Sequence, residues 1–234
     1  MSWVETAKRA AVLKALEEIQ DARIVGIGSG TTLELLVSEL AATLGPEASK
    51  LKLIPASHRI ESAMVKAGLT VVSPDEFPEI DLALDGADQA ALETLDLIKG
   101  GGAALTREKI IDTAAKRLIV VVDERKLTHK LGAGQKVPVE VIPFAQRLVM
   151  SRLTELGGKP TLRRETTGTP LITDNGNHVV DVDFGPIDDG PALEHQLKSI
   201  PGLLETGLFL NMTDRLYVGL RDGRVQVIKR RQLA

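Results

Sequence analysis

A run of five apolar residues, Leu118 to Val122, most constrains what this chain can fold into. Runs of this kind, rich in Ile and Val and without polar alternation, are typical of strands buried on both faces of a parallel sheet. Earlier in the chain, short apolar segments alternate with segments of helical spacing, of which 31–44 has the most regular apolar stripe. This alternation predicts an α/β fold with a doubly wound, mostly parallel sheet.

The pattern changes after Gly132. Strands are expected over 137–142, 160–164, 171–184 and 203–210, and helices over 143–156 and 192–199. The Asn175-Gly176 turn signal is expected to break the segment at 171–184. Their order, β-α-β-β-α-β, is that of a split βαβ unit and predicts a second, smaller α+β domain. A hairpin over 216–228 is expected to return to the first domain. We therefore expect one domain over 1–131 plus about 208–234, and the other over about 132–207.

The composition excludes several classes of function. Apolar residues make up 43% of the 234 residues, which allows a sizeable core, while the net charge of −3 and the 3% of aromatic residues do not favour a nucleic-acid partner. Without cysteine, the chain has no disulfides, thiol nucleophiles or thiolate metal sites. The sequence has no apolar stretch of about 18 residues, so no membrane-spanning helix is predicted. Residues 1–20 carry charges throughout, unlike a signal peptide, so we expect a cytoplasmic protein.

Ligands of open α/β sheets bind at the carboxyl ends of the strands, and four polar clusters follow predicted strands here. The first is Gly28-Ser29-Gly30-Thr31-Thr32, which precedes the helix at 31–44. Glycines let a backbone approach an anion, and a helix N-terminus offers N–H groups, so this loop suits a phosphate. The alternative is an ordinary cap, with Thr31 and Glu34 as a capping box. The loop does not match a dinucleotide-binding fingerprint, because the third glycine of that motif is missing. It does not match a nucleotide-binding P-loop, because no Gly-Lys-Ser/Thr follows.

The second cluster is acidic, and the fourth contains both acidic and basic residues. Asp85-Gly86-Ala87-Asp88 follows an apolar strand, and its carboxylates suit sugar hydroxyls, a metal ion or the capping of a turn. Asp123-Glu124-Arg125-Lys126 follows the run at 118–122. Lys126 suits a phosphate, and the alternative is a solvated charged loop. The four histidines are scattered without metal-ligand spacing, and no metal site is predicted.

The third cluster begins with Lys99 and the three glycines Gly100, Gly101 and Gly102, and ends at Lys109. Three consecutive glycines cost chain entropy on folding, and their N–H groups can form a nest for a developing oxyanion. A flexible linker is the alternative. Thr106 is the expected N-cap of the following helix, which puts Glu108 in its first turn, where a carboxylate commonly compensates the helix dipole.

Together these segments resemble the ribose-5-phosphate isomerase A family over nearly the whole chain. The stretch KGGGAALTREKI is close to a family signature, and SGTT, DGAD, VEVIPFA and TDNGN occur in the expected order. The resemblance implies interconversion of D-ribose 5-phosphate and D-ribulose 5-phosphate in the non-oxidative pentose phosphate pathway, with no metal or organic cofactor. It also implies a Rossmann-like large domain, a ferredoxin-like small domain, and a homodimer or homotetramer.

The resemblance also implies roles for individual residues. Glu108 corresponds to the general base, and Asp85, Asp88 and Lys99 to the residues that handle ring opening and the sugar oxygens. The positions implied as substrate contacts are Ser29, Gly30, Thr31, Thr32, Gly86, Ala87, Gly100, Gly101, Gly102 and Lys126. Two departures stand out: the glycine-rich loop of relatives is commonly TGST, and the acidic residue that often follows DGAD is Gln89 here.

This assignment agrees with the chemistry of aldose–ketose isomerisation. One carboxylate can take a proton from one carbon and return it to the next through an enediolate, whose charge the glycine N–H groups and Lys99 can stabilise. Two other functions use a similar pocket. A sugar-phosphate sensor would bind without turnover, but residues 1–20 are too few for a helix-turn-helix. An amino-sugar deaminase would release ammonia, and the pairing of DGAD with KGGG favours the isomerase instead.

Overall fold

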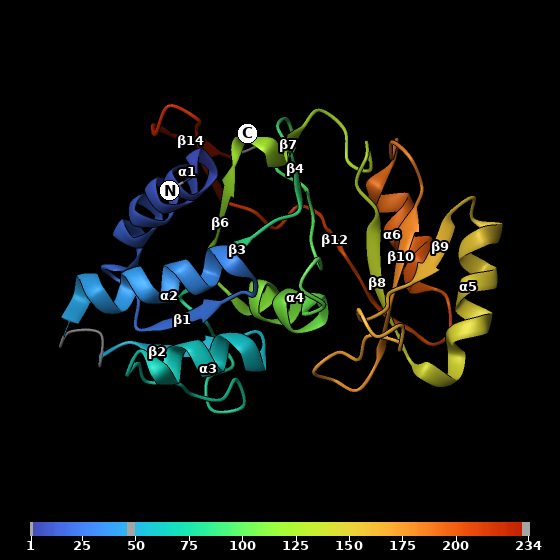
Figure 1. Cartoon of the computed structure of the whole chain (residues 1–234), viewed down its shortest axis with the longest axis horizontal. Coiled ribbons are helices and arrows are strands. Elements are labelled where there is room, and N and C mark those ends of the chain that lie inside the picture. Colours follow the sequence, from blue (N-terminus) through green and yellow to red (C-terminus); the bar gives the residue numbers. More distant parts are fainter. Residues whose placement is uncertain (1, 46–49, 231–234) are drawn as a thin grey trace. The chain divides into compact units, whose positions relative to one another are not determined.

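The computed structural model of the protein describes residues 2–45 and 50–230. The chain folds into two compact units (Figure 1). Unit 1 comprises residues 1–87, 107–127 and 212–234, and unit 2 comprises 88–106 and 128–211. These ranges group the glycine-rich segment with unit 2, whereas the sequence analysis expects it in the larger domain. The predicted domain ranges stay a prediction.

Unit 1 is built on a six-stranded sheet whose inner strands are parallel. The strands, in sheet order, are β14 (Val225–Lys229), β13 (Arg215–Gly219), β6 (Leu118–Asp123), β3 (Leu82–Gly86), β1 (Ile24–Ile27) and β2 (Lys52–Pro55). Only β14 runs antiparallel to its neighbour, β13. All six residues of β6 are buried, as its apolar run predicts. The expected C-terminal hairpin is confirmed, because β13 and β14 extend this sheet.

Helices cover both faces of this sheet, as expected for a doubly wound fold. On one face, α1 (Trp3–Leu16) and α2 (Thr31–Leu44) bury their apolar stripes against Val25, Ile27 and Leu84. On the other face, α4 (Leu105–Ala114) packs so closely on β1 that a Cβ at Gly26 would lie 2.2 Å from the Ile111 side chain. A further helix, α3 (His58–Lys66), follows β2. The predicted α/β class is therefore confirmed.

Unit 2 contains the predicted split βαβ unit. Its four strands form the antiparallel order β11-β8-β10-β9, the arrangement of ferredoxin-like domains. A second sheet, β12-β5-β4-β7, in which β12, β5 and β4 are antiparallel, was not predicted from the sequence because its strands are only two or three residues long. The bounds are β4 (Gln89–Ala91), β5 (Leu97–Ile98), β7 (Leu127–Thr128), β8 (Val137–Val141), α5 (Gln146–Glu155), β9 (Lys159–Leu162), β10 (His178–Asp183), α6 (Gly190–Lys198), β11 (Leu203–Thr206) and β12 (Leu208–Phe209).

The single strand expected over 203–210 is wrong, since Gly207 divides it into β11 and β12, which belong to different sheets. Gly207 donates from its N–H to the Pro138 carbonyl (2.7 Å) and accepts from the Lys99 N–H (2.9 Å). A Cβ at Gly207 would lie 2.4 Å from the Lys99 carbonyl oxygen. The approach of two other backbones thus requires glycine at this point. Between α3 and β3, Val71 forms only an isolated parallel bridge with Leu53.

Candidate active site

Three of the four polar clusters lie at one edge of the unit 1 sheet. β1, β2 and β3 are in register at Ile27, Pro55 and Leu84, and β6 runs parallel beside β3. The glycine-rich loop after β1, the acidic turn at the end of β3 and the charged segment after β6 therefore follow the carboxyl ends of parallel strands. The predicted position of residues 28–32, 85–87 and 123–126 at the carboxyl ends of strands is therefore confirmed, while their contacts with substrate stay a prediction. Asp88 and the segment 99–106 belong to unit 2.

The loop after β1 opens α2 without a capping side chain. Gly30 is the N-cap, with φ of +108°, and its carbonyl accepts from the N–H groups of Leu33 and Glu34, both at 3.0 Å. The alternative of a capping box from Thr31 and Glu34 does not hold, because Gly30 is the N-cap and Glu34 pairs with Arg59 (Nε–Oε1 2.5 Å). That hydrogen bond lowers the pKa of Glu34. The first turn of α2 thus presents N–H groups that no capping side chain occupies, which suits an anion.

Two buried carboxylates contact the backbone of this loop. The Ser29 N–H donates to Glu108 Oε1 at 3.2 Å. Gly28 lies so close to Asp85 that an added Cβ would be 1.8 Å from Asp85 Oδ1. Asp85 is fully buried and Glu108 is 4% exposed. The Gly86 N–H also donates to Asp85 Oδ1 (2.6 Å). The carboxylate predicted as base and the one predicted to handle the sugar therefore lie beside the same two-residue segment, Gly28-Ser29.

Two further residues near this loop escaped the sequence analysis. The Ser57 and Ser29 hydroxyl oxygens lie 2.9 Å apart, and Ser57 also accepts from the Ile60 N–H (3.2 Å) as the N-cap of α3. A serine before a helical pattern was the available signal for Ser57. Lys8 of α1 places Nζ 3.3 Å from Thr31 Oγ1, and both residues line a cavity of about 580 Å³. Lys8 was not predicted because it lies far from the loop in sequence.

Asp123, the first residue of the charged segment after β6, fixes the conformation of the residues that follow it. The buried Asp123 caps the 3₁₀ turn Glu124–Lys126 by accepting from the Arg125 N–H (3.2 Å), and it pairs with the Arg125 side chain (2.7 Å). Burial alone would raise the pKa of Asp123, but the contacts with Arg125 outweigh burial and lower it. Arg125 also stacks over Trp3, 5.6 Å from the ring centroid. Asp123 and Arg125 are thus structural, which leaves Lys126 as the candidate phosphate contact of this segment.

The remaining predicted residues lie together in unit 2. Asp88 Oδ2 accepts from the Gly101 N–H at 2.7 Å, and a Cβ at Gly101 would lie 2.6 Å from Asp88 Oδ1. Gly100 has φ of +103°, which favours glycine. Lys99 is 2% exposed and places Nζ 5.1 Å from the centroid of the Phe209 ring. The three glycines are therefore an ordered loop beside a carboxylate, not a flexible linker.

The start of α4 differs from the expected cap. The helix begins at Leu105, so Thr106 is inside it and is not its N-cap. The Thr106 hydroxyl instead donates to Glu140, a fully buried carboxylate of β8. Glu108 does lie in the first turn, as predicted. The hydroxyl was misassigned because its acceptor comes from a strand more than 30 residues away in sequence.

Gln89, the departure from the family pattern, has a structural role. Its Nε2 donates to the Ala133 carbonyl at 3.0 Å, and its Oε1 accepts from the Gly132 N–H at 2.8 Å. This pair of contacts needs one donor and one acceptor on the same side chain, which an amide supplies and an ionised carboxylate does not. Gln89 therefore fastens the turn at 132–133 within unit 2.

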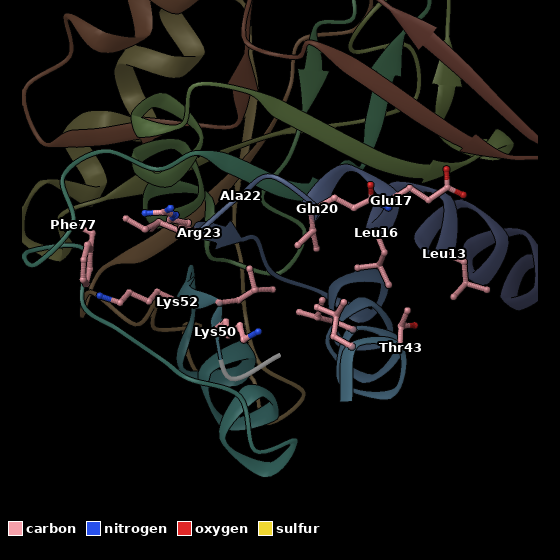
Figure 2. A pocket seen from close by; sticks show the side chains of 15 residues that line it. Leu13, Leu16, Glu17, Gln20, Ala22, Arg23, Thr43, Lys50, Lys52 and Phe77 are labelled. Carbon is pink, nitrogen blue, oxygen red and sulfur yellow. The ribbon is translucent and has the colours of Figure 1, made fainter. Parts of the chain in front are cut away.

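A cavity larger than the one beside Thr31 lies at the opposite edge of the unit 1 sheet. It has a volume of about 950 Å³ and includes Ile24 and Lys52, the first residues of β1 and β2. Figure 2 shows Leu13 and Leu16 among its apolar side chains, and Lys52 lies beside Phe77, 4.2 Å from the ring centroid. We place the site at the carboxyl edge instead, because the buried carboxylates and the open helix N-terminus lie there.

The described residues contain neither a metal-ligand cluster nor a helix that could span a membrane. Within 2–45 and 50–230, no group of three acidic or histidine side chains is arranged to hold a metal ion. None of the helices in the same residues combines the length and apolar character needed to cross a membrane.

Comparison with known proteins gives consistent matches. The model of the family described as ribose 5-phosphate isomerase A (phosphoriboisomerase A) matches residues 52–223. Ribose-5-phosphate isomerase A of Methanosarcina acetivorans is 44% identical over 96% of this chain and 95% of its own length. That of Thermomicrobium roseum is 42% identical over 94% of this chain and 92% of its own.

Solved structures agree in fold and sequence. Ribose 5-phosphate isomerase A from Methanocaldococcus jannaschii superposes with a TM-score of 0.91 at 39% identity, covering 97% of this chain and 99% of that one. A D-ribose-5-phosphate isomerase in complex with phospho-erythronic acid gives a TM-score of 0.92 at 39% identity, with the same coverage. On the agreement of family model, sequence and fold, the chain belongs to the ribose 5-phosphate isomerase A family.

Proposed function

We propose that Glu108 is the base in the aldose–ketose isomerisation that this protein catalyses, the interconversion of D-ribose 5-phosphate and D-ribulose 5-phosphate. The observation that carries the proposal is the hydrogen bond from the Ser29 N–H to the buried Glu108 carboxylate. Ser29 belongs to the loop whose other residues suit a phosphate. A hydrogen bond from a backbone N–H fixes the direction of the carboxylate before substrate arrives, which is what proton transfer requires.

The reaction moves one carbon-bound proton. Glu108 takes the proton from C2 of the open-chain aldose, the C2–H electron pair forms the C1–C2 double bond, and the carbonyl oxygen on C1 gains the negative charge. Glu108 then returns its proton to C1, the proton of the C2 hydroxyl passes to the oxygen on C1, and the oxygen on C2 becomes the carbonyl of the ketose. One carboxylate serves both steps if the two carbons present the same face to it.

The phosphate end of the substrate is assigned to unit 1. Ser29, Gly30, Thr31 and Thr32 supply hydroxyls and the N–H groups at the start of α2, and Lys126 supplies a positive charge. Lys8 joins this set because its Nζ lies 3.3 Å from Thr31 Oγ1. Binding energy from the phosphate, which does not react, helps to align the reacting carbons with the base.

The sugar oxygens are assigned to the remaining predicted residues. Asp85, Asp88 and Lys99 handle ring opening and the hydroxyls, and Gly86 and Ala87 contact the substrate. The N–H groups of Gly100 and Gly102 stabilise the enediolate, while the Gly101 N–H holds Asp88 (2.7 Å). A relative's complex with phospho-erythronic acid supports this assignment, because that ligand combines a phosphate with a second anionic group, the charge pattern of the enediolate.

The test is ketose formation from ribose 5-phosphate by the unmodified protein, by Glu108→Gln and by Glu61→Gln, an exposed glutamate of α3. We expect kcat of Glu108→Gln to fall by about 10²–10⁴-fold, the usual contribution of a general base, and Glu61→Gln to match the unmodified protein. Unchanged turnover by Glu108→Gln would show that another group is the base. Saturable binding without turnover in the unmodified protein would favour a sensor instead.

Three properties implied by the family resemblance remain proposals: a cytoplasmic location, catalysis without cofactor, and assembly as a homodimer or homotetramer. Light scattering of the purified protein distinguishes monomer, dimer and tetramer. Activity that survives dialysis against a chelator supports catalysis without a metal, and activity restored only by an added divalent cation contradicts it.

A further inference from the structure

One guanidinium in unit 2 holds the carbonyl groups of the glycine-rich loop. Arg163, which follows β9, donates from Nη1 to the Gly100 carbonyl at 2.8 Å and to the Gly101 carbonyl at 3.1 Å. Its other edge is fixed by Asp181 of β10, through Nε at 2.9 Å and through Nη2. Both side chains are largely buried, 16% and 22% exposed. A planar fork of five donors can bind a carboxylate and two carbonyls at once, which a lysine cannot do.

These contacts set the direction of the loop's N–H groups. In a planar trans peptide, the carbonyl of one residue and the N–H of the next point in opposite directions. Holding the Gly100 carbonyl therefore turns the Gly101 N–H away from Arg163, and holding the Gly101 carbonyl does the same for the Gly102 N–H. The first of these consequences is observed, because the Gly101 N–H donates to Asp88 Oδ2 at 2.7 Å.

Glycines need such support more than other residues. Three in a row have no Cβ to restrict φ and ψ, so the loop would sample many conformations unless contacts from outside select one. Gly100, at φ of +103°, is already in a conformation that other residues rarely adopt. The two bonds from Arg163 act on the two peptide groups that join Gly100, Gly101 and Gly102.

We infer that Arg163 is a positioning residue of the isomerase: it fixes two peptide planes of the glycine-rich loop, and through the Gly101 N–H it fixes Asp88. It acts through the loop and has no contact with substrate in this role. The inference rests on the proposed function of Asp88 and of the glycine N–H groups. Misplacement of such groups by about 1 Å can lower a rate by about 100-fold.

The test compares Arg163→Met with Arg164→Met. The second variant removes the adjacent arginine, whose Nη1 donates to the nearby Gly168 carbonyl (2.7 Å). We expect kcat of Arg163→Met to fall by about 10–100-fold with KM changed by less than about 3-fold, because the predicted phosphate contacts are untouched. Amide hydrogen exchange of the peptide covering 99–105 should become faster in this variant only. A kcat equal to that of Arg164→Met would overturn the inference, as would a rise in KM alone.

Two further measurements keep the test decisive. If Arg163→Met fails to fold, Arg163→Lys replaces it, and a kcat equal to that of the unmodified protein then overturns the inference, since lysine cannot bridge both carbonyls and Asp181. If the unmodified protein shows no turnover, the proposed function fails first. Hydrogen exchange of 99–105 then decides separately whether Arg163 holds the loop: faster exchange than in Arg164→Met supports that role, and equal exchange overturns it.

Discussion

The Thr106 hydroxyl donates to Glu140, and this bond joins the first turn of the helix that carries Glu108 to strand β8. Glu140 is fully buried, and it also accepts from the Thr173 hydroxyl at 2.8 Å and from Asn177 Nδ2 at 2.9 Å. The TDNGN stretch therefore supplies donors to a buried carboxylate. A buried charge is tolerated only where such donors surround it.

Thr106→Val should destabilise the protein, because it leaves an acceptor on a buried carboxylate without its donor. We expect the free energy of unfolding to fall by about 1–3 kcal/mol in urea denaturation. Thr106→Ser keeps the hydroxyl, so its free energy of unfolding should fall much less. Thr167→Val, at an exposed turn threonine, controls for the change of side chain. A larger loss in Thr106→Ser than in Thr106→Val would mean that the methyl group, and not the bond to Glu140, matters.

Gly28→Ala should abolish most of the activity. A Cβ at this position would lie 1.8 Å from Asp85 Oδ1, so either the loop or the carboxylate must move. Because Ser29, the next residue, donates to Glu108, we expect kcat/KM to fall by about 100-fold or more. Gly190→Ala is the matched control, since its Cβ would meet only Leu210 at 3.4 Å. Activity close to that of the control would show that Asp85 and Glu108 tolerate displacement.

Lys8→Met tests the part of the phosphate site that the sequence did not reveal. A charge-assisted hydrogen bond contributes about 1.5–3 kcal/mol, so we expect KM for ribose 5-phosphate to rise by about 10-fold or more. Inhibition by inorganic phosphate should weaken in parallel. Lys14→Met, an exposed lysine on the same helix, should leave both constants unchanged. A kcat loss without a change in KM would contradict a role in phosphate binding.

Local patterns in the sequence were enough to predict the doubly wound sheet, the split βαβ unit and the carboxyl-edge position of three of the four polar clusters. The β6 run and the α2 stripe carry this information within a few residues, because burial on a strand or helix imposes a period on the sequence. The approach of Ser29 to Glu108 was not predictable in the same way. It depends on α4 packing against β1, which brings together residues about 80 positions apart.

The errors have a common physical origin in hydrogen bonds made over long sequence distances. Thr106 and Glu34 both looked like local capping residues, and both instead bind partners on other elements, Glu140 and Arg59. Gly207 looked like a strand residue because its neighbours are apolar, yet two other backbones approach it. A pattern of residue types gives the local preference of a side chain, and tertiary partners override that preference when they are buried with it.

The cluster around Glu18 should make stability depend on pH in the acid range. Glu18 accepts from Arg117 at 3.1 Å and from Arg215 and Tyr217 of β13. Burial alone would raise the pKa of Glu18, but the hydrogen bonds from Tyr217 and Arg215 outweigh burial and lower it. A carboxyl with a lowered pKa stabilises the fold above its unfolded pKa, which is about 4.3, and loses that contribution as the pH falls through the folded value.

Glu18→Gln should therefore be less stable than the unmodified protein by about 1–3 kcal/mol at pH 7, and the difference should shrink as the pH falls below about 4. Urea denaturation between pH 3 and pH 7 measures this difference. Glu17→Gln is the matched control, because its exposed side chain pairs only with Lys14 among the ion pairs of the described residues. A difference between Glu18→Gln and the unmodified protein that stays constant across this range would show that the cluster contributes through packing and not through charge.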